Sequence, residues 1–387
     1  MTTTKNNEHK ELNVPNLRFK EFQGEWEKCT LGDASEFSKE RVNTQNLSSD
    51  NYVATENMLQ DYQGIIEASS VPTNTNVIKF NKGDVLLSNI RPYLKKVWFA
   101  DKNGGCSADV FVFKALSACI PDFLHYIIAN DRFINFAMSG AKGVKMPRGD
   151  KEQMKTYEIG LPSIEEQKKI AKLLSLLDER ITTQNKIIDK LQSLIKGIVD
   201  CTILRKEKNA IVGDVCSISE QIRAEANIDD IITVRLHGNG VCKSSAENLQ
   251  LGATQYYRRR AGQLIYGKQN FHNGAIGIVP ISLDNGITSK DIPSFDIDEM
   301  KCNSVYLLAQ LQSSQYYKPA EALTTGTGSK RLKEETFLKM PIVLPNKREQ
   351  DNIAVLIHRA SMNLDHAKRL LELLTIQKQY LLHQMFI

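Results

Sequence analysis

The chain carries the same helix-start sequence twice, 183 residues apart, and this duplication is the feature that most constrains its fold. Leu161-Pro-Ser-Ile-Glu-Glu-Gln is matched without a gap by Leu344-Pro-Asn-Lys-Arg-Glu-Gln. A repeat of this length predicts two copies of one structural unit, preceded by a short polar lead-in. Identical residues in the two copies are Leu161/Leu344, Pro162/Pro345, Glu166/Glu349, Gln167/Gln350, Ile170/Ile353, Ala171/Ala354, Leu173/Leu356 and Leu191/Leu374.

Each copy ends in a long predicted helix. Ser163-x-x-Glu166 and Asn346-x-x-Glu349 are typical starts, in which the N-cap oxygen accepts from a helical amide and the Glu reaches back. The narrow apolar stripe that follows leaves neither helix stable alone, so we expect the two helices to form a coiled-coil pair; ordinary core helices are the alternative. The stripe does not give the direction of the pair, but helices separated by a compact domain can lie antiparallel. The stripes are Ile164, Ile170, Leu173, Leu174, Leu177, Ile181, Ile188, Leu191, Ile195, Ile198, and Ile353, Leu356, Ile357, Leu364, Leu371, Leu374, Gln377, Leu381.

Between the helices the apolar pattern changes to short β-like runs separated by turn signals. Gly83-Asp84-Val85-Leu86 corresponds to Gly262-Gln263-Leu264-Ile265, and Leu31-Gly32-Asp33 to Val212-Gly213-Asp214. In the first copy we predict strands at 52–55, 77–80, 84–88, 97–100 and 109–113, turns at 81–83 and 103–105, and a helix at 121–138. In the second copy we predict strands at 231–235, 263–266 and 275–279, and a helix near 305–316.

The sequence therefore predicts an α/β (α+β) fold with two similar globular domains joined by two long antiparallel helices. The predicted boundaries are a lead-in at 1–25, a first domain at 26–160, a helix at 161–206, a second domain at 207–343 and a helix at 344–387.

The composition permits a polyanionic partner without identifying one. Lys and Arg number 50 against 45 Asp and Glu, and the 41% hydrophobic and 25% charged content is typical of a globular protein. The seven cysteines form no C-x-x-C pair, so we expect reduced thiols rather than a zinc cluster. The N-terminus lacks an apolar signal region and no run reaches about 18 apolar residues, which predicts a cytoplasmic protein with no membrane contact.

No motif for catalysis, a cofactor or a metal stands out. Gly262–Gln269 resembles a phosphate loop, but Gln269 stands where a magnesium-binding Ser or Thr is required. The acidic string Phe295–Lys301 is interpreted as a solvated loop, and the seven histidines lack ligand spacing. We therefore predict no catalytic or metal site. Two other functions stay open as alternatives to the DNA-binding function predicted below. One is a nuclease or methyltransferase acting by itself, and the other is a coiled-coil adaptor without DNA readout.

Basic and amide side chains recur in loops beside the predicted strands of both copies. Arg, Lys, Asn and Gln are the side chains that contact phosphates and read base edges, so these loops predict binding to double-stranded DNA. The candidate residues are Asn89, Arg91, Lys95, Lys96, Lys142, Lys145 and Arg148 in the first copy, and Arg258, Arg259, Arg260, Lys268, Gln269, Asn270, Lys330 and Arg331 in the second. The last two follow the segment Thr324–Ser329.

The order of these motifs resembles the specificity subunits of type I restriction-modification systems. The likeness covers essentially the whole chain and rests on both Leu-Pro-x-x-x-Glu-Gln helix starts. The other segments that carry it are Val14–Phe19, Gly24–Trp26, Leu31–Asp33, and Gly83–Ser88 continuing through Arg91-Pro92. The second copy departs from the pattern, because Gln263 replaces the Asp and no Arg-Pro follows Lys268. This departure leaves open which second-copy loop enters a DNA groove.

The resemblance implies two target-recognition domains, each reading one half of a bipartite DNA site, with the helices as spacer. It further implies two modification subunits that use S-adenosylmethionine to methylate adenine, and restriction subunits that use ATP and Mg²⁺ for translocation and cleavage. By this resemblance the chain itself is non-catalytic and holds no cofactor.

Overall fold

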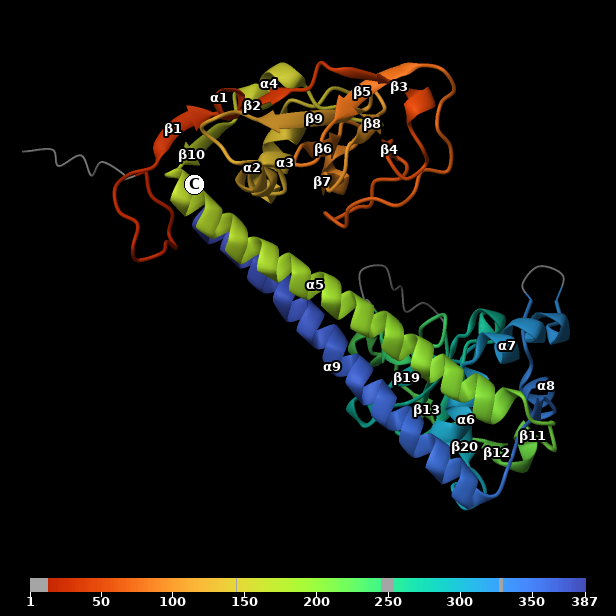
Figure 1. Ribbon diagram of the computed structural model, residues 1–387. Coiled ribbons are helices and arrows are strands. Elements are labelled where there is room, and N and C mark those ends of the chain that lie inside the picture. The colour runs from red at the N-terminus through yellow and green to blue at the C-terminus, as the bar shows by residue number, and fades with distance from the viewer. Residues whose placement is uncertain (1–12, 144, 245–253, 327–329) are drawn as a thin grey trace, which may run out of the picture. The chain divides into compact units, whose positions relative to one another are not determined.

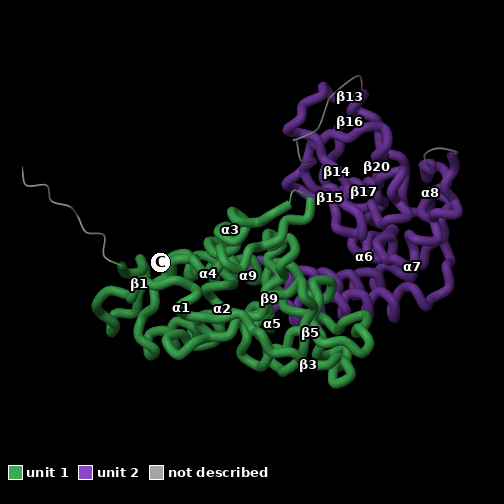
Figure 2. The backbone as a smooth tube through the Cα atoms, turned by 90° about the horizontal axis from the view of Figure 1, so that it is seen from above, with its two compact units in different colours: residues 1–183, 371–387 green, residues 184–370 purple. Residues whose placement is uncertain are grey.

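The computed structural model describes residues 13–143, 145–244, 254–326 and 330–387. Its contacts divide the chain into two compact units, which Figure 2 colours separately. Unit 1 contains residues up to 183 together with 371–387, and unit 2 contains residues 184–370. Each long helix therefore contributes one segment to each unit.

Unit 1 is built on two four-stranded sheets (Figure 1). The first has the order β2 (Ser35–Phe37), β9 (Val110–Ala115), β6 (Val85–Ser88), β7 (Val97–Phe99), and all its neighbours are antiparallel. The second has the order β3 (Arg41–Asn43), β5 (Asn76–Phe80), β8 (Gly104–Cys106), β4 (Tyr52–Val53), with β4 parallel to β8. A further pair joins β1 (Glu27–Thr30) to β10 (Glu158–Leu161). The short helices are α1 (Leu31–Ala34), α2 (Pro121–Ile128), α3 (Asp131–Ser139) and α4 (Lys151–Lys155).

Unit 2 repeats this plan. Its four-stranded sheet has the order β12 (Cys216–Ile218), β20 (Ser294–Ile297), β17 (Leu264–Tyr266), β18 (Ile276–Ile278). The second sheet is β13 (Arg223–Ala224), β16 (Tyr256–Arg258), β19 (Ile287–Ser289), and a parallel bridge from Ile231 to Ile287 replaces the β4–β8 pair. The remaining pairs are β14 (Ile232–Val234) with β15 (Val241–Lys243) and β11 (Ala210–Ile211) with β21 (Pro341–Ile342). The helices are α6 (Ser304–Leu311), α7 (Ser314–Tyr317) and α8 (Glu334–Leu338).

The two units agree in register as well as in strand order. Leu86 lies opposite Val112 in unit 1, and their counterparts Ile265 and Ser294 lie opposite each other in unit 2. The predicted duplication is therefore confirmed at the level of individual residue pairs.

Both predicted long helices are present, as α5 (Ile164–Val199) and α9 (Lys347–Met385). Within each unit their segments lie side by side in opposite directions, with Asp178 bound to Lys378 in unit 1 and Gln184 bound to Ala367 in unit 2. Buried seam positions follow the three- and four-residue steps of a coiled coil. They are Ile170, Leu174, Leu177, Leu374 and Leu381 in unit 1, and Gln184, Ile188, Ile353, Ile357, Ala360 and Ala367 in unit 2. Two predicted stripe members, Leu356 and Gln377, are instead exposed. Buried positions of α9 recur every seven residues from Ile353 to Leu381, with a second position four residues after the first at Ile357, whereas Leu356 and Gln377 follow the first position by three.

The predicted helix starts are confirmed only in part. The amides of Glu166 and Glu349 donate to Ser163 Oγ (3.3 Å) and Asn346 Oδ1 (3.0 Å), as N-caps require. The glutamate side chains do not reach back, however. Glu166 binds Arg18 of the lead-in, and Glu349 binds Lys206, so these carboxylates join each helix start to a neighbouring segment.

The glutamine after each glutamate fixes the helix to its domain. Gln167 Oε1 accepts from the Ile120 amide, and Gln167 Nε2 donates to the Ala118 and Pro162 carbonyls. Gln350 makes the same three bonds, to the Asn303 amide and the Lys301 and Pro345 carbonyls. Both side chains are buried, which explains physically why glutamine stands in both copies.

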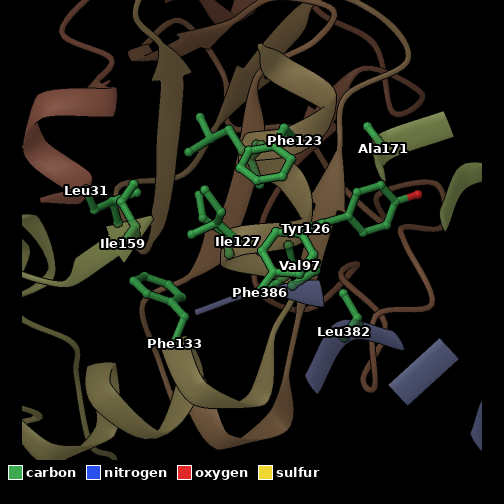
Figure 3. Packing of buried hydrophobic residues seen from close by; sticks show 14 of the residues in the cluster. Leu31, Val97, Phe123, Tyr126, Ile127, Phe133, Ile159, Ala171, Leu382 and Phe386 are labelled. Carbon is green, nitrogen blue, oxygen red and sulfur yellow. The ribbon is translucent and has the colours of Figure 1, made fainter. Parts of the chain in front are cut away.

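The largest core of unit 1 joins its domain to the end of α9. Phe123 of α2 stacks on Phe386 at a ring-centroid distance of 5.0 Å, and Figure 3 shows both rings among Tyr126, Ile127 and Leu382. The described part of the lead-in also lies here, because the Leu17 amide donates to the Gln384 carbonyl. Residues 1–12 of the predicted lead-in lie outside the described residues.

Several local predictions were wrong for physical reasons. The predicted helix at 121–138 is two helices, because Asn130 caps α3 by accepting from the Arg132 amide. The predicted turn at 103–105 contains β8, where a Cβ on Gly104 would lie 2.1 Å from the Asn51 carbonyl oxygen. All seven cysteines are unpaired in the structure. Among the described residues, no helix is long and apolar enough to cross a bilayer.

Candidate nucleic-acid interface

Backbone hydrogen bonds bring the predicted basic loops of unit 1 together. The Asn89 amide donates to the Asp109 carbonyl (2.8 Å), and the Asn89 carbonyl accepts from Gly149 (3.2 Å). The Arg91 amide donates to the Pro147 carbonyl, and Lys142 pairs with Arg148 across a short hairpin. We call residues 88–96, 107–110 and 142–149 the unit 1 frame. Val144 within this hairpin lies outside the described residues.

Unit 2 contains the same frame. The Lys268 amide donates to the Asp291 carbonyl (2.9 Å), and the Lys268 carbonyl accepts from Leu332 (2.9 Å). Thr325 pairs with Arg331 as Lys142 pairs with Arg148, 183 residues earlier. Residues 267–275, 289–292 and 325–332 form the unit 2 frame, of which 327–329 lie outside the described residues.

This correspondence identifies the second-copy loop that the sequence left open. Asp84 Oδ2 accepts from the Asn81 amide at the turn before β6, and Gln263 Oε1 accepts from the Arg260 amide at the turn before β17, so the glutamine replaces the aspartate in function. After each strand a 3₁₀ turn ends in a left-handed residue, Lys95 (φ 53°) or Gly274 (φ 76°). The loop 267–274 is therefore the counterpart of 88–95, although it lacks Arg-Pro.

Most predicted cations of the unit 1 frame have protein partners. Lys95 Nζ binds Asp131 (2.9 Å), and Lys96 Nζ donates to the Thr55 carbonyl (2.6 Å). Lys142 binds Asp150 (2.8 Å), and Arg148 lies 3.4 Å from Asp109 with 58% of its side chain exposed. Lys145 is exposed, and within the described part of the chain it has no ion-pair partner.

Two polar side chains of the unit 1 frame keep unused hydrogen-bonding capacity. Asn89 Oδ1 and Arg91 Nε are buried and have no partner among the described residues. Arg91 also adopts φ 52°, a backbone conformation that costs free energy for a non-glycine residue and is held here by the frame. Buried polar atoms without partners are uncommon, and at a binding surface they indicate groups that a ligand completes.

The predicted residues of the unit 2 frame differ in exposure. Lys268 is largely buried against Glu334 (2.6 Å). Arg331 lies 3.3 Å from Asp291, and Lys330 lies 3.2 Å from Glu321. Gln269 and Asn270 are exposed beside them.

The structure does not place the predicted arginines 258 and 260 in this frame, and Arg259 contacts it only from the buried side. They precede β17, whereas the frame loop follows it, and Arg258 and Arg260 are exposed there. The predicted basic loop is partly a strand, because Tyr256–Arg258 is β16.

Arg259 is fully buried, which corrects its prediction as a DNA contact. Its guanidinium donates to Thr288 Oγ1 (2.7 Å), Ser294 Oγ (2.9 Å) and the Ile292 carbonyl (2.9 Å). Burial lowers the pKa of Arg259 to about 10, so the group stays protonated at neutral pH. Arg259 therefore stabilises the 289–292 turn of the frame from the protein interior and does not face solvent.

Two further segments singled out from the sequence contain strands. The segment between Gly262 and Gly267 contains the buried strand β17, so these glycines do not enclose a phosphate loop. The predicted solvated loop at 295–301 begins inside β20, where Asp296 accepts from Ser219 and Gln263. Within the described residues, no cluster of three or more His, Cys, Asp or Glu side chains could hold a metal.

Sequence reasoning missed the two aspartates of the frames, Asp109 and Asp291. Each accepts a frame bond through its backbone and binds an arginine through its side chain. An alignment of the two copies by strand would have paired them, because each lies just before its strand, β9 or β20.

Comparisons with known proteins agree with this geometry. Residues 23–193 match the family described as the type I restriction modification DNA specificity domain. The chain is 23% identical over 377 residues to the specificity subunit of type I restriction enzyme MjaVIII from Methanocaldococcus jannaschii, covering 87% of each.

Two solved structures share the fold. The S subunit of the type I restriction-modification system from M. genitalium superimposes with a TM-score of 0.65 at 15% identity, over 97% of this chain and 99% of that one. A chain from a study of complex assembly and conformational transition of the type I R-M system gives a TM-score of 0.51 at 17% identity, over 92% and 96%.

Proposed function

The chain belongs to the specificity subunits of type I restriction-modification systems, and on that premise we propose that each unit reads one half of a bipartite duplex DNA site. The relatives are named as specificity subunits, which favours this role over an enzyme acting by itself. The observation that carries the proposal is the frame, which is the same in both units while most of the side chains on it differ.

The frame supplies what DNA reading requires. A fixed backbone carries Asn89 and Arg91 in unit 1, and the exposed Gln269 and Asn270 in unit 2, beside the largely buried Lys268. These are the side-chain types that distinguish purine edges in the major groove. Two units that carry different side chains on the same backbone geometry suit two half-sites of different sequence.

The long helices provide a second surface. Although their seam is buried, large apolar side chains on their outer positions are exposed. Exposed large apolar side chains in such number typically mark a protein interface, and we assign those of each unit to a modification subunit. The exposed residues include Leu176, Ile187 and Leu194 of α5 and Val355, Leu356, Met362, Leu370, Leu373, Ile376 and Tyr380 of α9.

The chemistry belongs to those partners in this proposal. The modification subunits bind S-adenosylmethionine and methylate adenine, and restriction subunits supply the steps that need ATP and Mg²⁺. The chain contributes base readout and the distance between the half-sites, which the paired helices set.

A domain exchange tests the proposal. Residues 26–155 are replaced by those of a relative, and methylated adenines are sequenced across the genome of cells with the exchanged or the original chain. We expect one half-site to change while the other half-site and the spacer stay the same. A change in both half-sites, or in neither, contradicts the proposal.

Inserting one heptad after Ile188 and one after Leu364 tests the spacer role separately. These positions lie in the seam segments of α5 and α9 within unit 2. We expect the same half-site sequences at a different separation, and an unchanged separation contradicts the role of the helices as spacer.

A further inference from the structure

The two frames share one charged pair. Arg148 lies 3.4 Å from Asp109, and Arg331 lies 3.3 Å from Asp291. Both arginines close the hairpin of their frame, and both aspartates accept a backbone bond from the first frame loop. The pairs are therefore the same feature in the two copies.

The surrounding polar positions are not shared. Asn89 corresponds to Lys268 and Lys142 to Thr325 by the frame bonds described above, and Arg91 corresponds to Asn270 by its position in the loop. If the units read different bases, the positions that differ between the frames are suited to reading the base sequence. The positions that agree are suited to contacting a group that every DNA duplex has. The phosphate backbone is that common element.

Stability does not explain the shared pair. The side chains of Arg148 and Asp109 are 58% and 40% exposed, and those of Arg331 and Asp291 are each 47% exposed. Exposed ion pairs at such distances contribute little to folding. A guanidinium that is half exposed at the edge of a DNA-reading frame, and only loosely held by its carboxylate, is available to a phosphate.

We propose that Arg148 and Arg331 are the sequence-independent phosphate anchors of the two frames, and that Asp109 and Asp291 hold them only while no DNA is bound. This inference rests on the proposed function, and assigns base reading to the positions at which the frames differ. In the free chain each carboxylate holds its arginine in place, and on binding the phosphate replaces the carboxylate.

The test uses the full chain, purified as the complex it forms in its own cells. Binding to a random-sequence duplex and to the methylated site is titrated over a salt series, and base preference is measured by selection from a randomised duplex library. For R148A and R331A we expect affinity for both duplexes to fall by a similar factor, roughly 5- to 10-fold. The slope of log affinity against log salt should shrink by about 1 while the selected sequence stays the same.

For D109N and D291N we expect DNA affinity to change in the opposite direction. Each arginine loses its competing carboxylate, so affinity for both duplexes should rise about 2- to 5-fold with unchanged base preference. The Asp-to-Asn change keeps the shape of the side chain and the backbone bond, which separates this effect from misfolding.

Matched controls remove a lysine from an ion pair at the opposite end of the same strands. K102A breaks the pair with Asp50 in unit 1, and K301A breaks the pair with Asp298 in unit 2. We expect their salt slopes to stay close to that of the wild type.

The outcomes separate the two proposals. A changed base preference in R148A or R331A, or an unchanged affinity and salt slope, overturns the phosphate anchors while base reading by the units stands. A wild-type complex that selects no sequence from the library overturns the proposed function itself.

Discussion

Beneath the frame, the two units fill three of four corresponding positions with opposite chemistry, and the fourth is apolar in both. In unit 1 the layer under the 107–110 turn is apolar and consists of Phe80, Cys106, Val110 and Val112. In unit 2 the same register positions hold Arg259, Thr288, Ile292 and Ser294, which hydrogen-bond to one another. The correspondence follows from strand pairing, since Ile78 opposes Cys106 as Tyr257 opposes Thr288.

The turn above the layer keeps its geometry despite this exchange. The Val110 amide donates to the Ser107 carbonyl at 3.1 Å, and the Ile292 amide donates to the Ser289 carbonyl at 3.1 Å. Either an apolar layer or a fully hydrogen-bonded layer is stable in the protein interior, whereas a mixture leaves buried polar groups without hydrogen-bond partners. The layer is therefore exchangeable as a set and not residue by residue.

The change F80R should have the largest effect, because it introduces a charge among apolar side chains. Phe80 is 0% exposed and packs edge-to-face on Trp98 at 5.5 Å. We expect a loss of about 4 kcal/mol or more in the stability of unit 1, measured by thermal unfolding and by hydrogen exchange of β5 and β6. F80L is the control and should cost roughly 1 kcal/mol. Similar unfolding of the two variants would show that the layer tolerates mixtures.

The reciprocal change R259F should cost unit 2 about 3 kcal/mol, because it leaves Thr288 Oγ1 and Ser294 Oγ without the guanidinium that donates to them. The triple variant R259F/T288C/S294V transplants the unit 1 set, and should recover most of this loss. Hydrogen exchange of β17 and β20 measures both the loss of stability and its recovery. If the triple variant is less stable than R259F, the layer does not behave as a set.

A pH difference between the units should follow from His125, whose counterpart in unit 2 is Leu308. Burial, reinforced by nearby Lys378, lowers the pKa of His125 to about 4 from 6.5, and Asp178 only partly opposes this. Between these values the unfolded imidazole takes up a proton that the folded one does not. Stability is therefore fully present above about pH 6.5 and falls as pH decreases towards 4.

Unfolding of the wild type and of H125L at pH 7 and pH 5 measures this effect. Wild-type unit 1 should lose stability at pH 5, and H125L should lose less. Equal losses in the two proteins would assign the pH dependence to other groups.

The smallest expected effect concerns the seam residue Gln184, whose repeat counterpart is Ala367. Gln184 is 8% exposed, and its Nε2 donates to the Ala367 carbonyl at 2.9 Å. A buried polar residue in a coiled-coil seam favours one register at a cost in stability. Q184L should therefore raise stability by about 0.5–1 kcal/mol in thermal unfolding, while the exposed control Q192L leaves it unchanged. A destabilised Q184L would mean that this hydrogen bond stabilises the pair.

How far the sequence predicts a contact depends on how many residues separate the two partners along the chain. The N-caps at Ser163 and Asn346 were predictable because a cap involves residues three apart. The glutamate contacts were not, because Arg18 lies 148 residues from Glu166. In the same way, loops 89–96 and 142–148 were each predicted as basic, but their joining through Asp109 depends on strand pairing.

The duplication, the two long helices and most central strands follow from the sequence, since repeats and apolar periodicity are carried by residues close together in the chain. Which polar side chains face solvent depends instead on the packing of the folded chain. Arg258 and Arg259 are neighbours with the same chemistry, yet one is exposed and the other fully buried. Alternation along a strand turns adjacent side chains to opposite faces, and the packing of distant segments decides which face is covered.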